Sequence, residues 1–518
     1  MAALGVDVGS SKLVSATLPL GEEGGQQHGR LPVLVRNRLS NDATPLAIVF
    51  QAGNRRELGE AAIDTPASNA DNLVAAFVPR LGAPGEQGAC RIPPAGAAQD
   101  AQVLRLEQVL AMLLGGQARN LEAQTGVQSP SHLVLAVPPA LAAQPGGAAA
   151  VRSAALIAGL DSVRLTTSTA ALVWHYAERH GRDIAEADGR DIAEAYAERH
   201  GRDIAEADVP RTVLIVDVGH MACSAVVARY TPRGGSQEIL LEILAEGGSF
   251  EAGGGVFDAI LGKHLQEKLE KEHGADACGG AKFLFRLNKA CEKLKKLLST
   301  VDPAKLDLDS LIPDKDCRLT VARKEWDAML QPSLEKLKEL VARVLAESGV
   351  AADGIEGVEA VGGGARVPCV QDALLASTGK PSLRHTLDSS AACGLGAAGI
   401  ARTLVQPSAP PPAQEEGAKG QGKAATFPVI TLSQAPWVEC GEEGMGEEEL
   451  REARALEGRF VEVEQAERER GAASNALETF VYAMRAALTG RHKEHLDAAH
   501  VTAACDAIEV SWGLLPNP

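Results

Sequence analysis

Two segments of the sequence place a carboxylate and a glycine directly after a run of hydrophobic residues. GVDVGSSKL contains Asp7, and VDVGHMACSA contains Asp217. A β-branched run that ends in Asp-x-Gly is typical of a buried strand entering a tight turn. Two such turns can set backbone N–H groups against phosphates while the two aspartates hold a hydrated magnesium ion. Each motif alone is more often an ordinary turn, so this interpretation needs support from the rest of the chain.

Two glycine clusters later in the chain supply that support. AGGGVFD spans residues 252–258, and AVGGGARVP spans residues 360–368. Both stand at expected junctions between a strand and a helix, where the N-terminus of the helix attracts anions. Four glycine-bearing junctions together predict a nucleotide site formed by two related lobes.

The elements that must position these junctions follow an alternating pattern. Strand-like runs such as HLVLAVP and TVLIVDVG alternate with helical patterns over residues 1–404, which predicts an α/β domain. Residues 405–425 are rich in Pro and Gly and predict a flexible linker. Residues 426–518 predict a small helical region, preceded by a short strand at 429–432. The repeated unit YAERHGRDIAEAD, within residues 176–208, is interpreted as a surface insertion rather than a metal site.

Bulk composition excludes several classes of function. The 518 residues carry 51 basic and 68 acidic side chains, a net charge of -17, so nucleic acid is not an expected partner. Nine scattered cysteines without a Cys-x-x-Cys pair predict packed thiols in a reducing compartment. A strand candidate at Leu4 leaves no room for a signal peptide, and no apolar run is long enough to span a bilayer. We expect a soluble protein without a membrane partner, in the cytoplasm or also in the nucleus.

The order of the motifs resembles the nucleotide-binding domain of the heat shock protein 70 superfamily. Besides the four glycine junctions, NDATPLAIVF at 41–50, LVLAVPPAL at 133–141 and IAGLDSVRL at 157–165 resemble segments of that domain. The resemblance covers residues 1–404 and implies an actin-like, two-lobed α/β ATPase fold with ribonuclease H-like repeats, followed here by a small C-terminal helical bundle. Asp-x-Gly-His-x-Ala at 217–222 and FRLNKACEKLKKLLS at 285–299 resemble the heat shock protein 110 branch.

The resemblance implies ATP or ADP with Mg²⁺ as cofactors and assigns the site residues. Asp7 and Asp217 would hold magnesium through water. In FRLNKACEKLKKLLS, three residues at i, i+3 and i+7 share one helical face, as adenosine contacts would. The expected nucleotide contacts are Gly9, Ser10, Ser11, Gly219, Gly253, Gly254, Glu292, Lys295, Ser299, Gly362, Gly363, Gly364 and Arg366.

Several positions depart from the pattern of the family. Val78 stands where the family has a lysine that orients the attacking water, with Arg80 the nearest cation. Ala222 replaces a threonine, and Ser224 and Ser168 replace acids. Losing one group that stabilises the transition state typically lowers the rate about a hundredfold or more, so hydrolysis should be very weak or absent. Ser390 replaces an acid beside the ribose.

The C-terminal region predicts what kind of family member this is. Residues 426–518 resemble the start of the helical lid, and too few residues remain for the β-sandwich that grips peptides in the family. Three functions stay open. The first is an ATP-binding co-chaperone in protein folding and the stress response, a nucleotide exchange factor or holdase for unfolded polypeptides that partners a heat shock protein 70 chaperone. The second is an ATP-hydrolysing chaperone that uses Arg80 or another cation in place of the missing lysine. The third is a degenerate actin-like scaffold without nucleotide, or an incomplete gene model.

Overall fold

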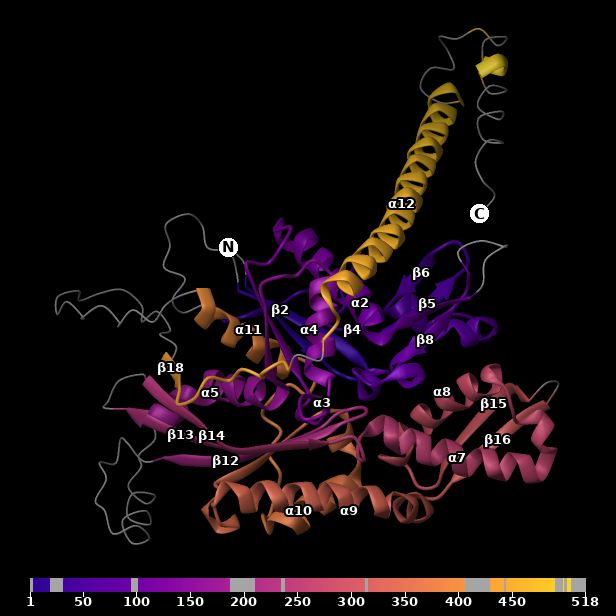
Figure 1. The fold of residues 1–518 in the computed structure, drawn as a ribbon. Coiled ribbons are helices and arrows are strands. Elements are labelled where there is room, and N and C mark those ends of the chain that lie inside the picture. The colour runs from indigo at the N-terminus through magenta and orange to yellow at the C-terminus, as the bar shows by residue number, and fades with distance from the viewer. Residues whose placement is uncertain are drawn as a thin grey trace, which may run out of the picture.

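Two mixed sheets form the centres of two lobes that lie one above the other in Figure 1. The computed structural model describes residues 3–18, 31–94, 101–186, 210–233, 238–312, 315–405, 429–441, 444–489, 497 and 501–504. Lobe I is built on the sheet that contains the N-terminal strand, and lobe II on the sheet that contains residues 211–218. This is the two-lobed α/β architecture that the resemblance implies.

In the sheet of lobe I, β1 lies between one antiparallel and one parallel neighbour. It pairs antiparallel with β2 and parallel with β10, which itself pairs parallel with β11. Asp7 lies opposite Ala136, near the carboxyl ends of the parallel strands, where open α/β sheets bind ligands. The strands in spatial order are β11 (Val163–Thr167), β10 (His132–Val137), β1 (Ala3–Val8), β2 (Lys12–Thr17) and β3 (Val33–Leu34), with β4 (Thr44–Pro45) also paired to β2.

The sheet of lobe II repeats the arrangement around the second aspartate. β12 pairs antiparallel with β13 and parallel with β17, which puts Asp217 opposite Ser224 on one side and Val361 on the other. The register therefore makes Asp217 the counterpart of Asp7. The strands in spatial order are β17 (Gly357–Val361), β12 (Arg211–Val218), β13 (Cys223–Arg233), β14 (Glu238–Ser249) and β18 (Val429–Leu432).

Two helices join the lobes. α5 (Ser168–Glu186) packs on the sheet of lobe II, α11 (Ala392–Val405) packs on that of lobe I, and the two helices pack against each other. Glycine permits this approach: a Cβ added at Gly5 would fall 2.0 Å from the backbone N of Ala398, and one at Gly396 would fall 1.8 Å from the carbonyl O of Ala171. The other helices around the two sheets are α2 (Leu106–Thr125), α3 (Pro139–Ala142), α4 (Gly147–Ile157), α9 (Arg323–Ser348) and α10 (Pro368–Thr378).

Each lobe carries a smaller outer part, and the two outer parts touch. Helix α8 (Ala281–Leu298) of lobe II packs against the 3₁₀ helix Ala67–Asn72 of lobe I. From the same helix, the Lys289 ammonium donates to the carbonyl O of Ile63 at 2.8 Å. The lobes are thus closed over the space between them. The outer part of lobe I has β5 (Ala47–Gln51), β6 (Arg55–Leu58), α1 (Glu60–Ile63), β7 (Leu73–Ala75), β8 (Ala89–Ile92) and β9 (Gln102–Arg105). That of lobe II has α7 (Gly254–His273), α8 (Ala281–Leu298), β15 (Ala304–Ile312) and β16 (Lys315–Val321).

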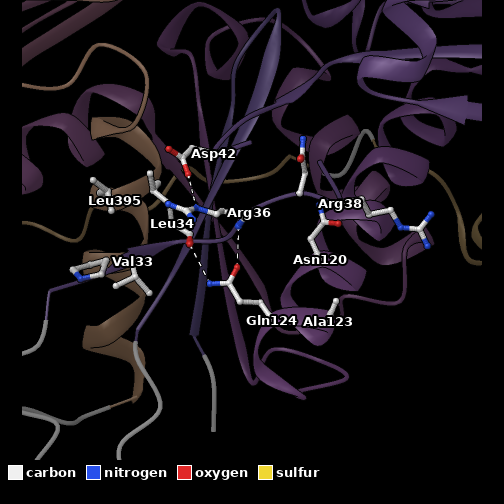
Figure 2. A pocket seen from close by; sticks show the side chains of 11 residues that line it. Val33, Leu34, Arg36, Arg38, Asp42, Asn120, Ala123, Gln124 and Leu395 are labelled. Carbon is white, nitrogen blue, oxygen red and sulfur yellow. Dashed lines mark hydrogen bonds and ion pairs between the residues drawn. The ribbon is translucent and has the colours of Figure 1, made fainter. Parts of the chain in front are cut away.

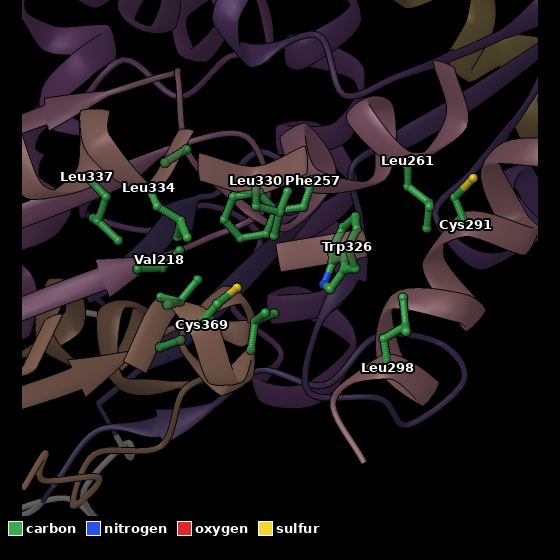
Figure 3. Close-up of a cluster of buried hydrophobic side chains, with 14 of the residues drawn as sticks. Val218, Phe257, Leu261, Cys291, Leu298, Trp326, Leu330, Leu334, Leu337 and Cys369 are labelled. Carbon is green, nitrogen blue, oxygen red and sulfur yellow. The ribbon is translucent and has the colours of Figure 1, made fainter. Parts of the chain in front are cut away.

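The hydrophobic core forms one large cluster in each lobe and a third between them. In lobe II, Phe257 of α7 and Trp326 of α9 are almost fully buried and belong to the same cluster as Val218 at the end of β12 (Figure 3). This packing fixes the start of α7 against the turn that follows Asp217. The cluster between the lobes includes Trp174 of α5 and Ile400 of α11.

The C-terminal region lies against both lobes. The predicted strand at 429–432 is confirmed as β18, but it extends the sheet of lobe II by pairing parallel with β14. Helix α12 (Glu447–Thr489) begins on lobe I and then projects away from it (Figure 1). The expected linker at 405–425 lies outside the described residues except for Val405, which ends α11.

The first repeat copy begins in an ordered helix. Tyr176 and Ala177 belong to α5 and are buried in the cluster between the lobes. The expected surface insertion is therefore wrong for these residues, because the hydrophobic face of α5 continues into the repeat. Residues 187–208, which hold the rest of the repeats, lie outside the described residues.

Candidate nucleotide site

Asp7 and Asp217 lie close enough to influence each other's ionisation. Burial raises the pKa of Asp7 to about 6, and it raises the pKa of Asp217 to about 7, with the negative charge of Asp7 adding to the effect. The Lys12 ammonium attracts both carboxylates, and the Cys393 thiol hydrogen-bonds Asp7. Lys12 is part of GVDVGSSKL, so its presence at the site was open to prediction. Cys393 comes from α11, and its presence could not be predicted from the sequence, because only the fold brings it close to Asp7.

The donor set and the glycine loops fit a hydrated divalent cation beside phosphates. Two carboxylates that repel each other in a buried setting favour a cation between them, and oxygen ligands suit Mg²⁺. A Cβ at Gly362 would fall 2.3 Å from the Asp217 Oδ1, whereas one at Gly363 would meet nothing within 4 Å. The glycine cluster AVGGGARVP therefore lies directly against Asp217 and leaves open space beyond. Among the described residues, no three His, Cys, Asp or Glu side chains are grouped to hold a metal directly.

The turn between β1 and β2 contains Gly9, Ser10 and Ser11, three of the expected nucleotide contacts. Gly9 is required because a Cβ there would fall 2.8 Å from the carbonyl O of Lys12. Ser10 is buried and Ser11 is exposed, and the Ser11 carbonyl accepts from the Leu46 N–H at 2.8 Å. The turn is thus held by the segment NDATPLAIVF, which the sequence had linked to the same domain.

The turn that follows Asp217, between β12 and β13, is hydrogen-bonded to the start of α7. The Gly219 N–H donates to the carbonyl O of Ala222 at 2.9 Å, and the Gly254 N–H donates to the carbonyl O of Gly219 at 2.8 Å. A Cβ at Gly253 would fall 2.4 Å from the His220 carbonyl O. Gly219, Gly253 and Gly254 are therefore brought together as predicted, but the Gly254 N–H bonds to the loop and is not free for a phosphate.

The His220 side chain fills space beside this turn that a smaller side chain would leave empty. A Cβ at Gly255 would fall 2.5 Å from its Cε1 atom, so the ring lies against the first turn of α7. Burial, reinforced by the nearby Lys295 ammonium, lowers the pKa of His220 to about 4. The imidazole is consequently neutral at pH 7.

Lys295 is tied to a carboxylate that sequence reasoning did not assign. Its Nζ lies 2.5 Å from Asp258 Oδ2 and donates to the Gly254 carbonyl O at 2.8 Å. Burial raises the pKa of Asp258 to about 6 even though Lys295 acts in the opposite direction. Asp258 is the last residue of the motif AGGGVFD, and its place in that motif could have indicated that it belongs to the site.

Of the other expected adenosine contacts, Glu292 and Ser299 lie at the same end of α8 as Lys295. Glu292 is exposed and pairs with Lys296 at 2.6 Å, and Ser299, which ends α8, donates to the Lys295 carbonyl O at 3.1 Å. Gly364 is buried against Val218, while Arg366 is exposed at the end of the 3₁₀ helix Gly363–Arg366. Ser390 is also exposed, and its N–H donates to Asp388.

The positions of the missing catalytic groups are filled by buried residues. Val78 has no exposed surface and belongs to the core of lobe I, and Ala222 and Ser224 are buried in lobe II. Arg80 is not free to replace the missing lysine. Its guanidinium donates to the carbonyl O atoms of Gln87 at 2.7 Å and Ala89 at 2.8 Å.

A carboxylate from lobe II reaches the residues on either side of Ser168. Ser168 is buried at the start of α5, and Glu246 of β14 accepts from the hydroxyls of Thr167, at 2.8 Å, and Thr169. The contact connects the two lobes at the point where the family has its own acid. Sequence reasoning missed Glu246, since nothing local to β14 indicates a partner some eighty positions earlier in the chain, at separations of 79 and 77 residues.

A separate groove opens on the outer side of lobe I. It encloses about 780 Å³ and is lined by residues of β3 and α2, with Arg36 bound to Gln124 and Asp42 (Figure 2). None of the expected nucleotide contacts lines it. No helix in the described part of the chain is long and apolar enough to cross a membrane.

Comparison with known proteins identifies the family. A family model described as Hsp70 protein matches residues 3–409. Heat shock protein 110 of Caenorhabditis elegans is 26% identical over 419 residues, which cover 77% of this chain and 49% of that protein. Heat shock protein hsp88 of Neurospora crassa is 27% identical over 417 residues, 77% of this chain and 53% of that protein. Heat shock 70 kDa protein 14 of Arabidopsis thaliana is 30% identical over 249 residues, 48% of this chain and 26% of that protein.

The chain spans about half the length, or less, of these relatives. The match confirms the actin-like fold class, and it agrees with the His-containing second turn that the sequence had linked to one branch. The chain belongs to the Hsp70 family, and its similarity to heat shock protein 110 and hsp88 assigns it to the heat shock protein 110 branch of that superfamily.

Proposed function

We propose that this protein is an ATP-binding co-chaperone that promotes nucleotide exchange on a heat shock protein 70 chaperone, with little or no hydrolysis of its own. One observation carries the proposal: the glycine and aspartate residues that would hold the nucleotide are gathered in one place, while the positions needed for hydrolysis hold Val78, Ser168, Ala222 and Ser224. The division into a nucleotide domain at 1–404, a linker at 405–425 and a helical region at 426–518 is part of this proposal, as is a cytoplasmic or nuclear location.

Nucleotide binding is supported by the geometry around Asp217. In the proposed complex Asp7 and Asp217 hold Mg²⁺ through water, and the open side of Gly363 faces the phosphates. When bound, the magnesium neutralises phosphate charge. Thermal unfolding with and without millimolar Mg-ATP tests this step, because a ligand at one hundred times its dissociation constant adds about 2.7 kcal/mol. The absence of a shift would favour the scaffold without nucleotide.

Weak hydrolysis is supported by the contacts of Arg80. A working ATPase needs a positioned cation in place of the missing lysine, and phosphoryl transfer depends on such positioned charge. Arg80 already donates to two backbone carbonyls, Gln87 and Ala89. We therefore expect single-turnover hydrolysis near background, and no further loss in Arg80→Gln. A wild-type rate that falls strongly in Arg80→Gln would support the ATP-hydrolysing chaperone instead.

A role toward a partner chaperone is supported by the closed lobes and the projecting helix. Contact between α8 and the segment Ala67–Asn72 keeps the outer parts of the lobes together, which gives a partner a fixed surface. The distal half of α12, with Phe480 and Tyr482 exposed, extends beyond lobe I and offers a second contact. Holding unfolded polypeptides would use the same exposed side chains.

The test is stopped-flow release of a fluorescent nucleotide from an ATP-hydrolysing heat shock protein 70. Full-length protein is compared with the fragment ending at Leu404 and with the double variant Asp7→Asn, Gly363→Asp. We expect the fastest release with the full-length protein, slower release with the fragment and the slowest with the variant. If none of the three changes the release rate, a holdase or scaffold role replaces the exchange factor.

A further inference from the structure

A second cavity lies at the end of the lobe II sheet that is remote from the nucleotide site. It encloses about 230 Å³, and its polar lining comes from Tyr176, His180, Arg211, Glu356, Arg384 and Thr386. Arg211 is the first residue of β12 and Asp217 the seventh, so at about 3.3 Å per residue the two ends of the strand are roughly 20 Å apart. The cavity is therefore separate from the nucleotide site.

Among the described residues at the cavity, the charged side chains have hydrogen-bonding partners except for one arginine. Arg384 donates to Glu356 through both terminal nitrogens, at 3.2 and 3.1 Å, which neutralises that carboxylate. The buried Glu359 carboxylate also has hydrogen-bonding partners, because it accepts from the N–H and the hydroxyl of Thr386. The Arg211 side chain makes no hydrogen bond or ion pair within the described residues, although its backbone belongs to the ladder between β12 and β13. Its guanidinium is the charge left for a ligand.

The walls of the cavity combine aromatic surface with further donors. The rings of Tyr176 and Tyr230 lie with centroids 5.3 Å apart, and both residues are buried. The Arg384 guanidinium also lies beside the Tyr176 hydroxyl. Such a lining suits a ligand with an anionic end and a small apolar body. Tyr176 and His180 both belong to the first copy of the repeat YAERHGRDIAEAD, so the repeat contributes directly to this cavity.

The size of the cavity restricts the ligand further. Sites for drug-sized molecules usually measure about 300–1,000 Å³, so about 230 Å³ is too small for a nucleoside triphosphate. We propose that this cavity binds a small organic anion, with a phosphate or carboxylate group on Arg211 and an aromatic or aliphatic body against Tyr176 and Tyr230.

Calorimetric titration of the full-length protein tests the proposal, with Mg-ATP kept at a saturating concentration throughout. Phenyl phosphate and benzoate distinguish a phosphate from a carboxylate ligand, and phenol has the same ring without charge. We expect at least one anion to bind and phenol not to bind. Absence of binding by both anions at millimolar concentration would overturn the proposal. Binding that is seen in a parallel titration without Mg-ATP but is lost when Mg-ATP is present would overturn it too, because the anion would then occupy the nucleotide site.

Two matched variants locate the binding. Arg211→Gln removes the unpaired charge and should weaken anion binding about tenfold or more, equivalent to about 1.4 kcal/mol. Arg229→Gln removes an arginine from β13 on the opposite face of the same sheet, since Arg229 is paired with Thr212 and neighbouring residues alternate between faces. It should leave the affinity unchanged. Equal affinity in wild type and Arg211→Gln would exclude this cavity as the site.

Discussion

His220 determines the chemistry of the turn that follows Asp217. Its ring lies against the first turn of α7, in a place where Gly255 leaves just enough room. Burial and the Lys295 ammonium keep it neutral. The turn therefore carries a bulky, uncharged side chain where a phosphate loop usually has small residues, and the positive charge beside this turn comes from Lys295, itself paired with Asp258.

The lowered pKa of His220 predicts a loss of stability in mild acid. The folded state disfavours protonation, so this stabilisation is present above the ordinary histidine pKa of 6.5 and is lost as the pH falls toward about 4. We expect the free energy of unfolding of wild type to fall by about 2 kcal/mol more than that of His220→Gln over this interval. Urea denaturation of both proteins at pH 7.0, 5.5 and 4.5 measures the difference. Parallel curves would mean that His220 titrates normally.

Val78 predicts that the missing lysine cannot simply be restored. The side chain has no exposed surface and packs in the core of lobe I, so Val78→Lys would bury an unpaired ammonium. We expect a loss of about 3 kcal/mol in the free energy of unfolding and no gain in hydrolysis. Val78→Ile, which changes volume by one methylene, should cost about 1 kcal/mol. Restored turnover in Val78→Lys would show that this position can face the nucleotide.

At the scale of elements, α12 is attached to lobe I by a buried group of charges. The Arg56 side chain is fully enclosed and lies 2.6 Å from both Glu457 Oε2 and Glu464 Oε1. Phe460 lies between these glutamates on the same helix, under the Arg56 guanidinium and edge-on to Phe50. The first half of α12 is thereby a fixed part of lobe I, whereas its second half projects beyond it.

Removing the buried arginine should release this helix. Arg56→Ala leaves Glu457 and Glu464 without their partner, and breaking a buried pair in this way costs about 3 kcal/mol, so amide exchange in the first half of α12 should rise about a hundredfold. Arg55 is the matched control, because it pairs with Glu467 on the same helix but is half exposed. Arg55→Ala should change exchange by less than about fivefold. Equal effects of the two variants would contradict a specific role for burial.

At the scale of the whole molecule, residues 429–441 connect the two lobes. They begin as β18 on lobe II and continue to lobe I, where the Thr166 hydroxyl donates to the Pro436 carbonyl O at 2.6 Å and the Val438 N–H donates to the Leu165 carbonyl O at 2.9 Å. Between these bonds the Trp437 ring lies under the Arg164 guanidinium. The distance from the ring centroid to Arg164 Cζ is 4.9 Å. One segment of chain thus spans the junction of the lobes.

Trp437→Ala should loosen this connection without unfolding either lobe. It removes a cation–π contact and apolar surface, together worth about 1–2 kcal/mol, so amide exchange in β18 and at Val438 should rise about tenfold. The hairpin of β15 and β16, far from this segment in Figure 1, provides the internal control and should not change. Unchanged exchange in β18 would mean that its pairing with β14 is sufficient by itself.

Local patterns allowed much of the fold to be predicted, and long-range contacts account for what was missed. Alternating strands and helices, with glycine at the junctions, predicted the lobes and the places where Asp7, Gly362 and Asp217 would meet. Asp258 is part of the motif AGGGVFD, but the sequence did not indicate a function for it, because its ion pair is made with Lys295 from another helix. The docking of α12 and the commitment of Arg80 to carbonyl groups depend on partners that no local pattern names. The repeat was predicted to lie on the surface because most of its residues are polar, and this pattern did not indicate that Tyr176 would be buried.

The pairing of β18 with β14 also affects how the protein behaves toward other chains. Without those four residues, β14 would end the sheet with a row of unsatisfied N–H and C=O groups. Such an edge is a template on which a strand from another molecule can add, and proteins commonly protect it. Here the protection comes from the chain's own Val429–Leu432. Conditions that detach this segment would therefore turn lobe II into a surface prone to aggregation, even while every other element keeps its fold.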